Sequence, residues 1–271
     1  MTYTEITSRK NSNIIFARSL SAEKKSRNES GMFALEGIKL LTEALEADLC
    51  VSSVYFTQKA LDAYSDTLEK TYESGAQMFL VTDEVYSKLT DESAPQGIYA
   101  CVKKPSVTKL GSEELSAGSF VFLESVQNPA NIGAILRSCY ALGFGKIILN
   151  KECSDIYSPK CLRAAMGSVF RIKSYFEEDI ISIAGNISSF SNVRIFCTSL
   201  SEKSVKLGTI SFNETDCFVI GNEGHGVSKE MFDACSHSLY IPMNIGAESL
   251  NAAAAAALVM WEMKKSTLLS Q

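Results

Sequence analysis

The sequence has few of the residues and patterns on which several common protein classes depend. His225 and His237 are the only histidines among its 271 residues, which argues against a Ser/His/Asp triad and against a metal site built from several histidines. No apolar run reaches 18 residues and no signal-peptide layout is present, so we expect a cytoplasmic protein with no membrane span. The eight cysteines form no C-x-x-C pair and lie mostly in apolar runs, which favours buried, reduced thiols over zinc ligands or disulfides. We therefore predict no metal site.

Charge is distributed unevenly along the chain. The net charge is −5, yet the first 30 residues hold six basic and only three acidic side chains, a local charge of +3. The basic residues are Arg9, Lys10, Arg18, Lys24, Lys25 and Arg27. A basic segment on an acidic body is typical of a localised contact with a polyanion such as nucleic acid. An ordinary solvated helix face has the same composition, and charge alone does not separate the two interpretations.

The first hundred residues alternate between short apolar runs and amphipathic segments. Strands are expected at 33–35, 51–56, 77–81 and 97–103. Helices are expected at 37–47, 58–72 and 83–89, the last capped by Thr82. This order predicts a small α/β domain over residues 1–104. Residues 105–118 lose the apolar periodicity and contain Pro105, so they are interpreted as a linker.

The remaining residues, 119–271, predict a second α/β domain. Strands are expected at 119–124, 146–149, 169–172, 193–197, 217–220 and 239–241. Helices are expected to begin after Asn128 and Ser158, each followed by proline, to span 179–190, and to close the chain. Six strands alternating with helices indicate a parallel sheet covered on both faces.

Polar and glycine-rich loops follow the last two predicted strands. Gly221, Gly224 and Gly226 allow a tight turn or the close approach of a ligand, although plain turn chemistry produces the same pattern. The second loop leads to six consecutive alanines, 252–257, a strong helix former with little side-chain bulk. Ser249 or Glu248 is expected to cap this helix, whose first turn would hold Asn251. Loops beyond strand ends are where α/β proteins build their sites.

Three segments together resemble one family. Asn-Pro-Ala-Asn-Ile-Gly-Ala-Ile-Leu-Arg at 128–137, Ile-Gly-Asn-Glu-Gly-His-Gly-Val-Ser at 220–228, and Ile-Pro-Met at 241–243 with Glu-Ser-Leu-Asn at 248–251 match, in order and spacing, motifs of the SpoU/TrmH family. Its members are S-adenosylmethionine-dependent RNA 2′-O-ribose methyltransferases. The resemblance extends from Ser119 to about Lys265. The first domain resembles the ribosomal-protein-like RNA-binding domain of such enzymes, most clearly at Glu36-Gly37.

The resemblance implies a fold feature and a set of site residues. The catalytic domain would contain a deep trefoil knot, which periodicity alone does not predict. Catalysis would involve Arg137 as the key residue, with Asn131, Glu223, Ser249 and Asn251. The cofactor would be bound by Thr198, Leu200, Gly221, Asn222, Gly226, Ile241, Met243 and Leu250. RNA would be contacted by Arg9, Lys10, Lys24, Lys25, Arg27 and Arg163. One departure is Ala252-Ala253, where the family commonly has Val-Ser, so a hydroxyl at Ala253 is absent.

The implied reaction is methyl transfer from S-adenosylmethionine to a ribose 2′-hydroxyl of structured RNA, with ribosomal RNA favoured over transfer RNA. A guanidinium is hard to deprotonate, so Arg137 is interpreted as a phosphate-binding and oxyanion-stabilising group, and the general base stays open. A non-catalytic RNA-binding relative and a base-methylating relative are the alternatives. A homodimer through the knot region is also expected, because Leu258, Val259, Met260 and Trp261 surround the final helix with apolar surface. Packing of that helix on the first domain is the alternative.

Overall fold

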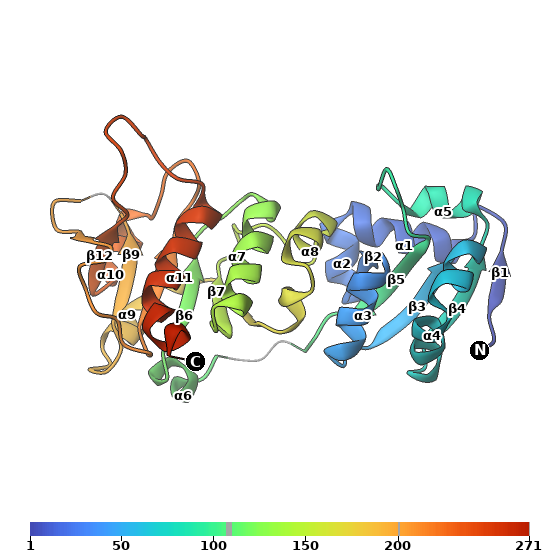
Figure 1. Cartoon of the computed structure of the whole chain (residues 1–271), viewed down its shortest axis with the longest axis horizontal. Helices are drawn as coiled ribbons and strands as arrows, with labels where there is room; N and C mark the ends of the chain where they lie inside the picture. The colour runs from blue at the N-terminus through green and yellow to red at the C-terminus, as the bar shows by residue number, and fades with distance from the viewer. Residues whose placement is uncertain (107–109, 200, 271) are drawn as a thin grey trace. The chain divides into compact units, whose positions relative to one another are not determined.

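Two β-sheets, one in each half of the chain, organise the structure, a computed structural model that describes residues 1–106, 110–199 and 201–270. The chain forms two units, shown in Figure 1. The first unit contains Met1–Ser106 together with Tyr157–Phe170, and the second contains Val107–Ile156 and Arg171–Gln271. In the described part of the chain, no helix combines the length and apolar character needed to cross a membrane.

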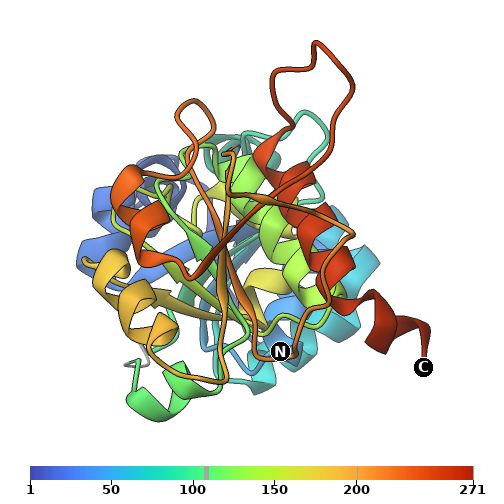
Figure 2. The same cartoon turned by 90° about the vertical axis from the view of Figure 1, so that its left-hand side faces the viewer.

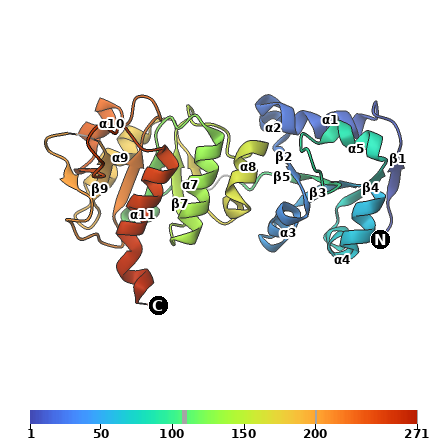
Figure 3. The ribbon, with the colours of Figure 1, turned by 45° about the horizontal axis from the view of Figure 1, so that its top comes forward.

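The sheet of the first unit has five strands in the order β1-β4-β3-β5-β2. These are β1 Thr4–Ile6, β2 Met32–Glu36, β3 Val51–Phe56, β4 Gln77–Val81 and β5 Ile98–Lys103. Strand β5 runs antiparallel to β2 and β3, whereas β1, β4 and β3 are mutually parallel. Helices α1 Ser12–Ala22, α2 Lys24–Ser30 and α5 Asp83–Leu89 lie on one side of the sheet, and α3 Ile38–Glu46 and α4 Gln58–Glu73 lie on the other (Figure 3).

Sequence periodicity predicted much of this unit. Strands β3 and β4 and helix α5 begin and end at the predicted residues, and the Thr82 side chain accepts a hydrogen bond from the Val85 amide as a cap. Strand β1 and helices α1 and α2 were not predicted, because the first 30 residues were interpreted only by their charge. Helix α1 contributes Ile14, Ala17 and Leu20 to the core between α1, α5 and the sheet.

A segment from the middle of the chain packs with the first unit. It contains α8 Pro159–Ala165 and the short 3-10 helix η1 Ser168–Phe170. The ring of Phe33 in β2 stacks on Tyr157 at 4.8 Å between centroids and lies 5.9 Å from Phe170. The predicted strand at 169–172 is therefore wrong: Val169 is buried in η1, and the strand follows at Lys173–Phe176.

The second sheet has seven strands in the order β10-β12-β9-β11-β6-β7-β8, and all its strand pairs are parallel. The strands are β6 Phe120–Leu123, β7 Lys146–Leu149, β8 Lys173–Phe176, β9 Ile195–Thr198, β10 Val205–Lys206, β11 Cys217–Ile220 and β12 His237–Tyr240. Helices α9 Ile180–Ser188 and α10 Lys229–Ala234 cover one face, and α7 Pro129–Ala141 and α11 Ala252–Leu269 cover the other (Figure 2). The prediction of a parallel sheet covered on both faces is confirmed.

The segment interpreted as a linker contains structure of its own. A short helix, α6 Ser112–Ser116, precedes β6. Leu110 and Leu115 pack against the core between the second sheet and α9. The apolar side chains were too few and too irregularly spaced for this contact to be predicted.

Arg27 lies inside the first unit rather than on its surface. Its side chain is 4% exposed, and its guanidinium donates to the carbonyl of Leu20 at 2.7 Å, at the end of α1. A cation at a helix C-terminus stabilises the terminal carbonyls. The expectation that Arg27 contacts RNA is corrected accordingly. Lys24 and Lys25, which lie in α2 with Arg27, are exposed.

We expect Arg27→Ala to lower the free energy of unfolding by about 2 kcal/mol or more, because buried carbonyls lose a charged donor. Lys24→Ala, the matched control, is expected to change it by less than about 0.5 kcal/mol. Urea denaturation followed by circular dichroism measures both. Equal stability of the two variants would contradict the structural role of Arg27.

Candidate active site

Four loops meet at one edge of the second sheet. They follow β6, β9, β11 and β12, which are neighbouring parallel strands, so their carboxyl ends lie at the same edge. The loop after β6 leads into α7, the loop after β11 contains the glycines, and the loop after β12 leads into α11. The three motifs of the sequence thus come together in space.

The side chain of Asn131 joins all three motifs. It is 7% exposed and lies in the first turn of α7, where Asn128 caps the helix and Pro129 follows, as predicted. Its Nδ2 donates to Glu223 Oε1 at 3.0 Å, and its Oδ1 accepts from Asn251 Nδ2 at 2.9 Å. These partners are 92 and 120 residues away in sequence. One buried amide therefore fixes the relative positions of three loops.

The carboxylate of Glu223 holds the loop after β6. It accepts from the backbone amides of Gln127 at 3.1 Å and Asn128 at 3.0 Å, as well as from Asn131. Partial burial is the largest single influence and would raise the pKa of Glu223, but the three hydrogen bonds together lower it. The group is therefore a charged acceptor except in acid, and its arrangement suits the positioning of loops.

The glycine loop is a tight turn in which Gly221 has no space for a side chain. Asn222 and Gly226 exchange two backbone hydrogen bonds of 3.0 and 2.9 Å. A Cβ on Gly221 would lie 2.2 Å from the carbonyl carbon of Gly226, and Gly226 itself has a φ of +72°. The Asn222 side chain bonds to Ser125, Gly224 and His225 within this network. The turn that the glycines predicted is thus present here.

Asn251, and not Ser249 or Glu248, is the N-cap of α11. Its Oδ1 accepts from the amides of Ala253 at 2.9 Å and Ala254 at 3.3 Å, while its Nδ2 donates to Asn131. The predicted caps, Ser249 and Glu248, precede the observed cap by two and three residues. Asn251 therefore couples the start of α11 to the start of α7, and these two helices pack against each other.

Several predicted site residues lie outside this hydrogen-bond cluster. Arg137 is exposed on α7, and it has no ion pair or hydrogen bond with any residue that the structure describes. Ser249 is exposed in the loop 241–250, which has neither helix nor strand. Thr198 donates its hydroxyl to the Val219 carbonyl at 3.0 Å. Leu200 is outside the described residues.

The loop after β12 holds the remaining predicted cofactor residues. Ile241 and Met243 are half-buried, and Leu250 is 41% exposed.

Glu124 is a site residue that the sequence did not reveal. It follows β6, is 7% exposed, and accepts from both the amide and the hydroxyl of Ser228, at 2.9 and 2.5 Å. Ser228 in turn caps α10. Glu124 therefore fixes the far end of the glycine loop. A single glutamate after a strand carries no spacing signal by which it could have been found.

The predicted RNA-contacting residues lie in the first unit. Lys10, Lys24 and Lys25 are exposed, whereas Arg9 donates to the Glu84 carbonyl at 2.9 Å. Arg163, on α8, pairs with Glu92 at 2.8 Å. Basic side chains that are already paired contribute less to polyanion binding than free ones.

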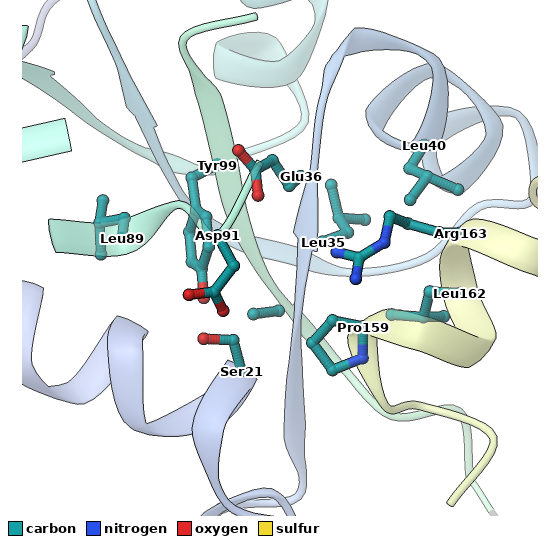
Figure 4. Close-up of a pocket in the computed structure, with 11 residues that line it drawn as sticks. Ser21, Leu35, Glu36, Leu40, Leu89, Asp91, Tyr99, Pro159, Leu162 and Arg163 are labelled. Carbon is teal, nitrogen blue, oxygen red and sulfur yellow. The ribbon is translucent and has the colours of Figure 1, made fainter. Parts of the chain in front are cut away.

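Arg163 points into a small pocket of the first unit, shown in Figure 4. The cavity volume is about 20 Å³, enough for one water molecule and too small for a ligand. Glu36 lines it, and burial raises the pKa of this carboxyl although Thr90 and Tyr86 donate to it. The pocket is thus part of the packing of the unit. Within the described residues, no group of three or more His, Cys, Asp or Glu side chains could hold a metal ion.

A glycine turn at the carboxyl edge of a parallel sheet, joined to two flanking loops by buried side chains, defines an α/β domain of the kind that binds a nucleotide-like cofactor. Comparison with known proteins specifies the family. Residues 118–261 match the SpoU rRNA Methylase family, and residues 11–100 match the MRM3-like substrate binding domain. The chain belongs to the SpoU rRNA methylase family.

Relatives resemble the chain over most of its length. The 23S rRNA (guanosine(2553)-2′-O)-methyltransferase RlmP of Bacillus subtilis is 28% identical, over 89% of this chain and 92% of that protein. The 23S rRNA (uridine(2479)-2′-O)-methyltransferase of Streptomyces viridochromogenes is 27% identical, over 90% of this chain and 86% of that protein. The crystal structure of an AdoMet-bound rRNA methyltransferase from Sinorhizobium meliloti is 27% identical, with a TM-score of 0.84 over 97% of this chain and 98% of that chain.

We expect Gly221→Ala to destabilise the protein by about 1–3 kcal/mol, because the added methyl group meets rigid backbone. Gly224→Ala is the matched control, since a Cβ there meets only Asn222 Oδ1, at 3.5 Å, an ordinary contact. Its effect is expected to stay within about 1 kcal/mol. Thermal unfolding measures both, and equal tolerance of the two alanines would show that the turn is not constrained at Gly221.

Proposed function

We propose that this protein transfers a methyl group from S-adenosylmethionine to a ribose 2′-hydroxyl of ribosomal RNA. The observation that carries the proposal is the bonding of Asn131 to Glu223 and Asn251, which assembles the three motifs at one edge of the sheet. Family membership supports methyl transfer to ribosomal RNA. The names of two relatives support the ribose oxygen as acceptor. These names differ in nucleotide, so the proposal stops at the ribose of ribosomal RNA.

The residues at this edge fit the proposed cofactor. When bound, this cofactor would supply a methyl group that is activated by its attachment to a sulfonium. The loop after β12 would supply apolar contacts for an adenosine ligand through Ile241, Met243 and Leu250, and it follows a strand of the same parallel sheet as the glycine turn after β11. Thr198, Leu200, Asn222 and Gly226 would complete the binding residues, Asn222 by its backbone because its side chain is engaged in the turn. The AdoMet-bound relative supports this choice of cofactor.

Arg137 is the proposed catalytic residue. It projects from α7, whose first turn Asn131 anchors, and its guanidinium is free to bind an RNA phosphate with two parallel hydrogen bonds. The same group would stabilise negative charge on the 2′-oxygen as its proton leaves. Asn131 and Glu223 would act by positioning, and Ser249 and Asn251 would face the substrate from the third motif.

The wider architecture of the proposed enzyme follows the family. We infer a trefoil knot around the loops after β11 and β12, supported by membership of the SpoU rRNA methylase family. The first unit would recruit RNA through Lys10, Lys24 and Lys25, and the reaction would take place in the cytoplasm. The proposed homodimer would use the face of α7 and α11, where Tyr140, Leu258 and Trp261 are 53%, 44% and 43% exposed.

We expect Arg137→Ala to bind S-adenosylmethionine as the wild type does but to turn over about 10²-fold more slowly, the loss typical of a charge-stabilising donor. Arg137→Lys should recover little, because an ammonium cannot replace a two-pronged guanidinium. The assay uses labelled cofactor and unmodified ribosomal RNA, and alkaline hydrolysis then locates ribose methylation. Wild-type product that lacks alkali resistance would overturn the proposed 2′-oxygen. Full activity of Arg137→Ala would overturn only the role of Arg137.

The dimer has its own test. Light scattering at micromolar concentration should give about twice the chain mass of 29.6 kDa. Trp261→Glu should reduce the mass towards one chain, because a charge is placed in the apolar interface. Phe16→Glu, at an aromatic residue of α1 that is 40% exposed, is the control and should leave the mass unchanged. A wild-type mass near one chain would refute the dimer.

A further inference from the structure

The first unit contains a second, much larger cavity, separate from the proposed cofactor site. It lies among α4, α5 and the segment 90–97, and its volume is about 760 Å³. This volume is within the range of pockets that bind small ligands. Its lining combines polar and apolar surface and includes Thr57, Lys59, Tyr64, Asp83 and Gln96.

The walls of this cavity are held in place before any ligand binds. The Thr57 amide donates to the Gly97 carbonyl at 3.0 Å, and the Ile38 amide donates to Gln96 Oε1 at 3.1 Å. The Tyr86 hydroxyl donates to the Ile98 carbonyl at 2.9 Å. These bonds attach the segment 90–97 to the starts of α3 and α4, and α5 to β5. A ligand would therefore lose little affinity to the ordering of the site.

The acidic side chains of the lining are mostly neutralised. Asp91 accepts two hydrogen bonds from Arg18, at 2.8 and 2.7 Å, and Glu92 pairs with Arg163 at 2.8 Å. Lys59 and Asp83 have no ion pair or hydrogen bond with any residue in the described ranges. The lining thus offers a donor and an acceptor without surplus positive charge. A phosphate requires such a surplus, whereas the edge of an uncharged base requires both donors and acceptors.

Tyr64 supplies an aromatic surface to the same cavity. It is half-buried, and α4 departs from helical geometry at this residue, with φ −134° and ψ 30°. No proline or glycine is present in α4 to cause this kink. Across the described residues, its hydroxyl has no hydrogen-bond partner, so the ring is the part that can be used in recognition. Proteins bind unpaired bases by stacking on such rings and by hydrogen bonds to the base edge.

We propose that this cavity binds one unpaired nucleobase of the RNA substrate, stacked on Tyr64 and hydrogen-bonded at its edge by Lys59 and Asp83. The inference rests on the proposed function, because it assumes that RNA is the substrate. It adds a contact to a base, whereas Lys10, Lys24 and Lys25 would contact only phosphates. Base contacts carry sequence preference and phosphate contacts do not.

The first experiment detects the contact directly. The full-length protein is irradiated at short ultraviolet wavelength with unmodified ribosomal RNA, and the tryptic peptides are analysed by mass spectrometry. Cleavage after Lys59 and Lys70 releases Ala60–Lys70, which contains Tyr64. We expect this peptide to carry a nucleotide. Nucleotides found only on other peptides would overturn the inference. A cavity that binds a protein instead of a base would give the same result, because Ala60–Lys70 would then carry no nucleotide.

The second experiment measures methylation kinetics. Tyr64→Ala should raise KM for RNA about tenfold, the effect of losing one stacked base, with kcat and cofactor affinity unchanged. Tyr64→Phe keeps the ring and should match the wild type. Lys59→Gln should raise KM several-fold, whereas Lys70→Gln, also in α4 but outside the lining, should not.

The outcomes separate the inference from the proposed function. Circular dichroism is used to check that each variant is folded. Lys59 is exposed, so Lys59→Gln tests the cavity without disturbing the core. A wild-type protein that methylates RNA, together with a Tyr64→Ala variant of unchanged KM, would overturn the base site alone. A wild-type protein without methyl transfer would overturn the proposed function, and the crosslinked peptide would still decide whether a base occupies the cavity.

Discussion

The amide of Asn131 is the interaction on which the arrangement of the site depends. An amide can donate on one side and accept on the other, and here it does both, towards Glu223 and towards Asn251. Both partners make further hydrogen bonds: Glu223 accepts from the backbone before α7, and Asn251 caps the start of α11. Loss of the Asn131 side chain would therefore remove a hydrogen bond from each partner and loosen the contact among loops from three distant parts of the chain. Coupling of this kind positions a reacting site with little freedom to reorganise.

The elements that the sequence predicted are those with strong local signals. Strands β3, β7 and β11 are short apolar runs that end at polar or glycine residues, and the structure gives them the predicted bounds. The cap of α7 at Asn128 combines asparagine with a following proline, two local preferences in agreement. The exposure of Arg137 followed from its place off the apolar stripe of its helix.

The elements that the sequence did not predict depend on distant contacts. Val169 and Phe170 have high strand propensity, but they form a 3-10 turn in which Phe170 lies against the ring of Phe33, more than a hundred residues earlier. Arg27 has the composition of a surface cation and becomes buried because α1 ends beside it. The proposed knot is equally inaccessible to local patterns, since a knot depends on the path of the whole chain and not on periodicity.

The packing of Tyr157–Phe170 with the first unit has a consequence for the exchange of gene segments by recombination. This segment is encoded between β7 and β8, in the middle of the second sheet, yet its aromatic side chains cover Phe33 of the first. A recombination event that exchanged residues 1–106 alone would carry a domain without part of its apolar cover, and the recipient would expose Phe33 to water. A functional exchange has to transfer two separate stretches of gene at once, or neither. The first unit is thus built from two stretches of sequence, and neither stretch alone contains all of its apolar packing.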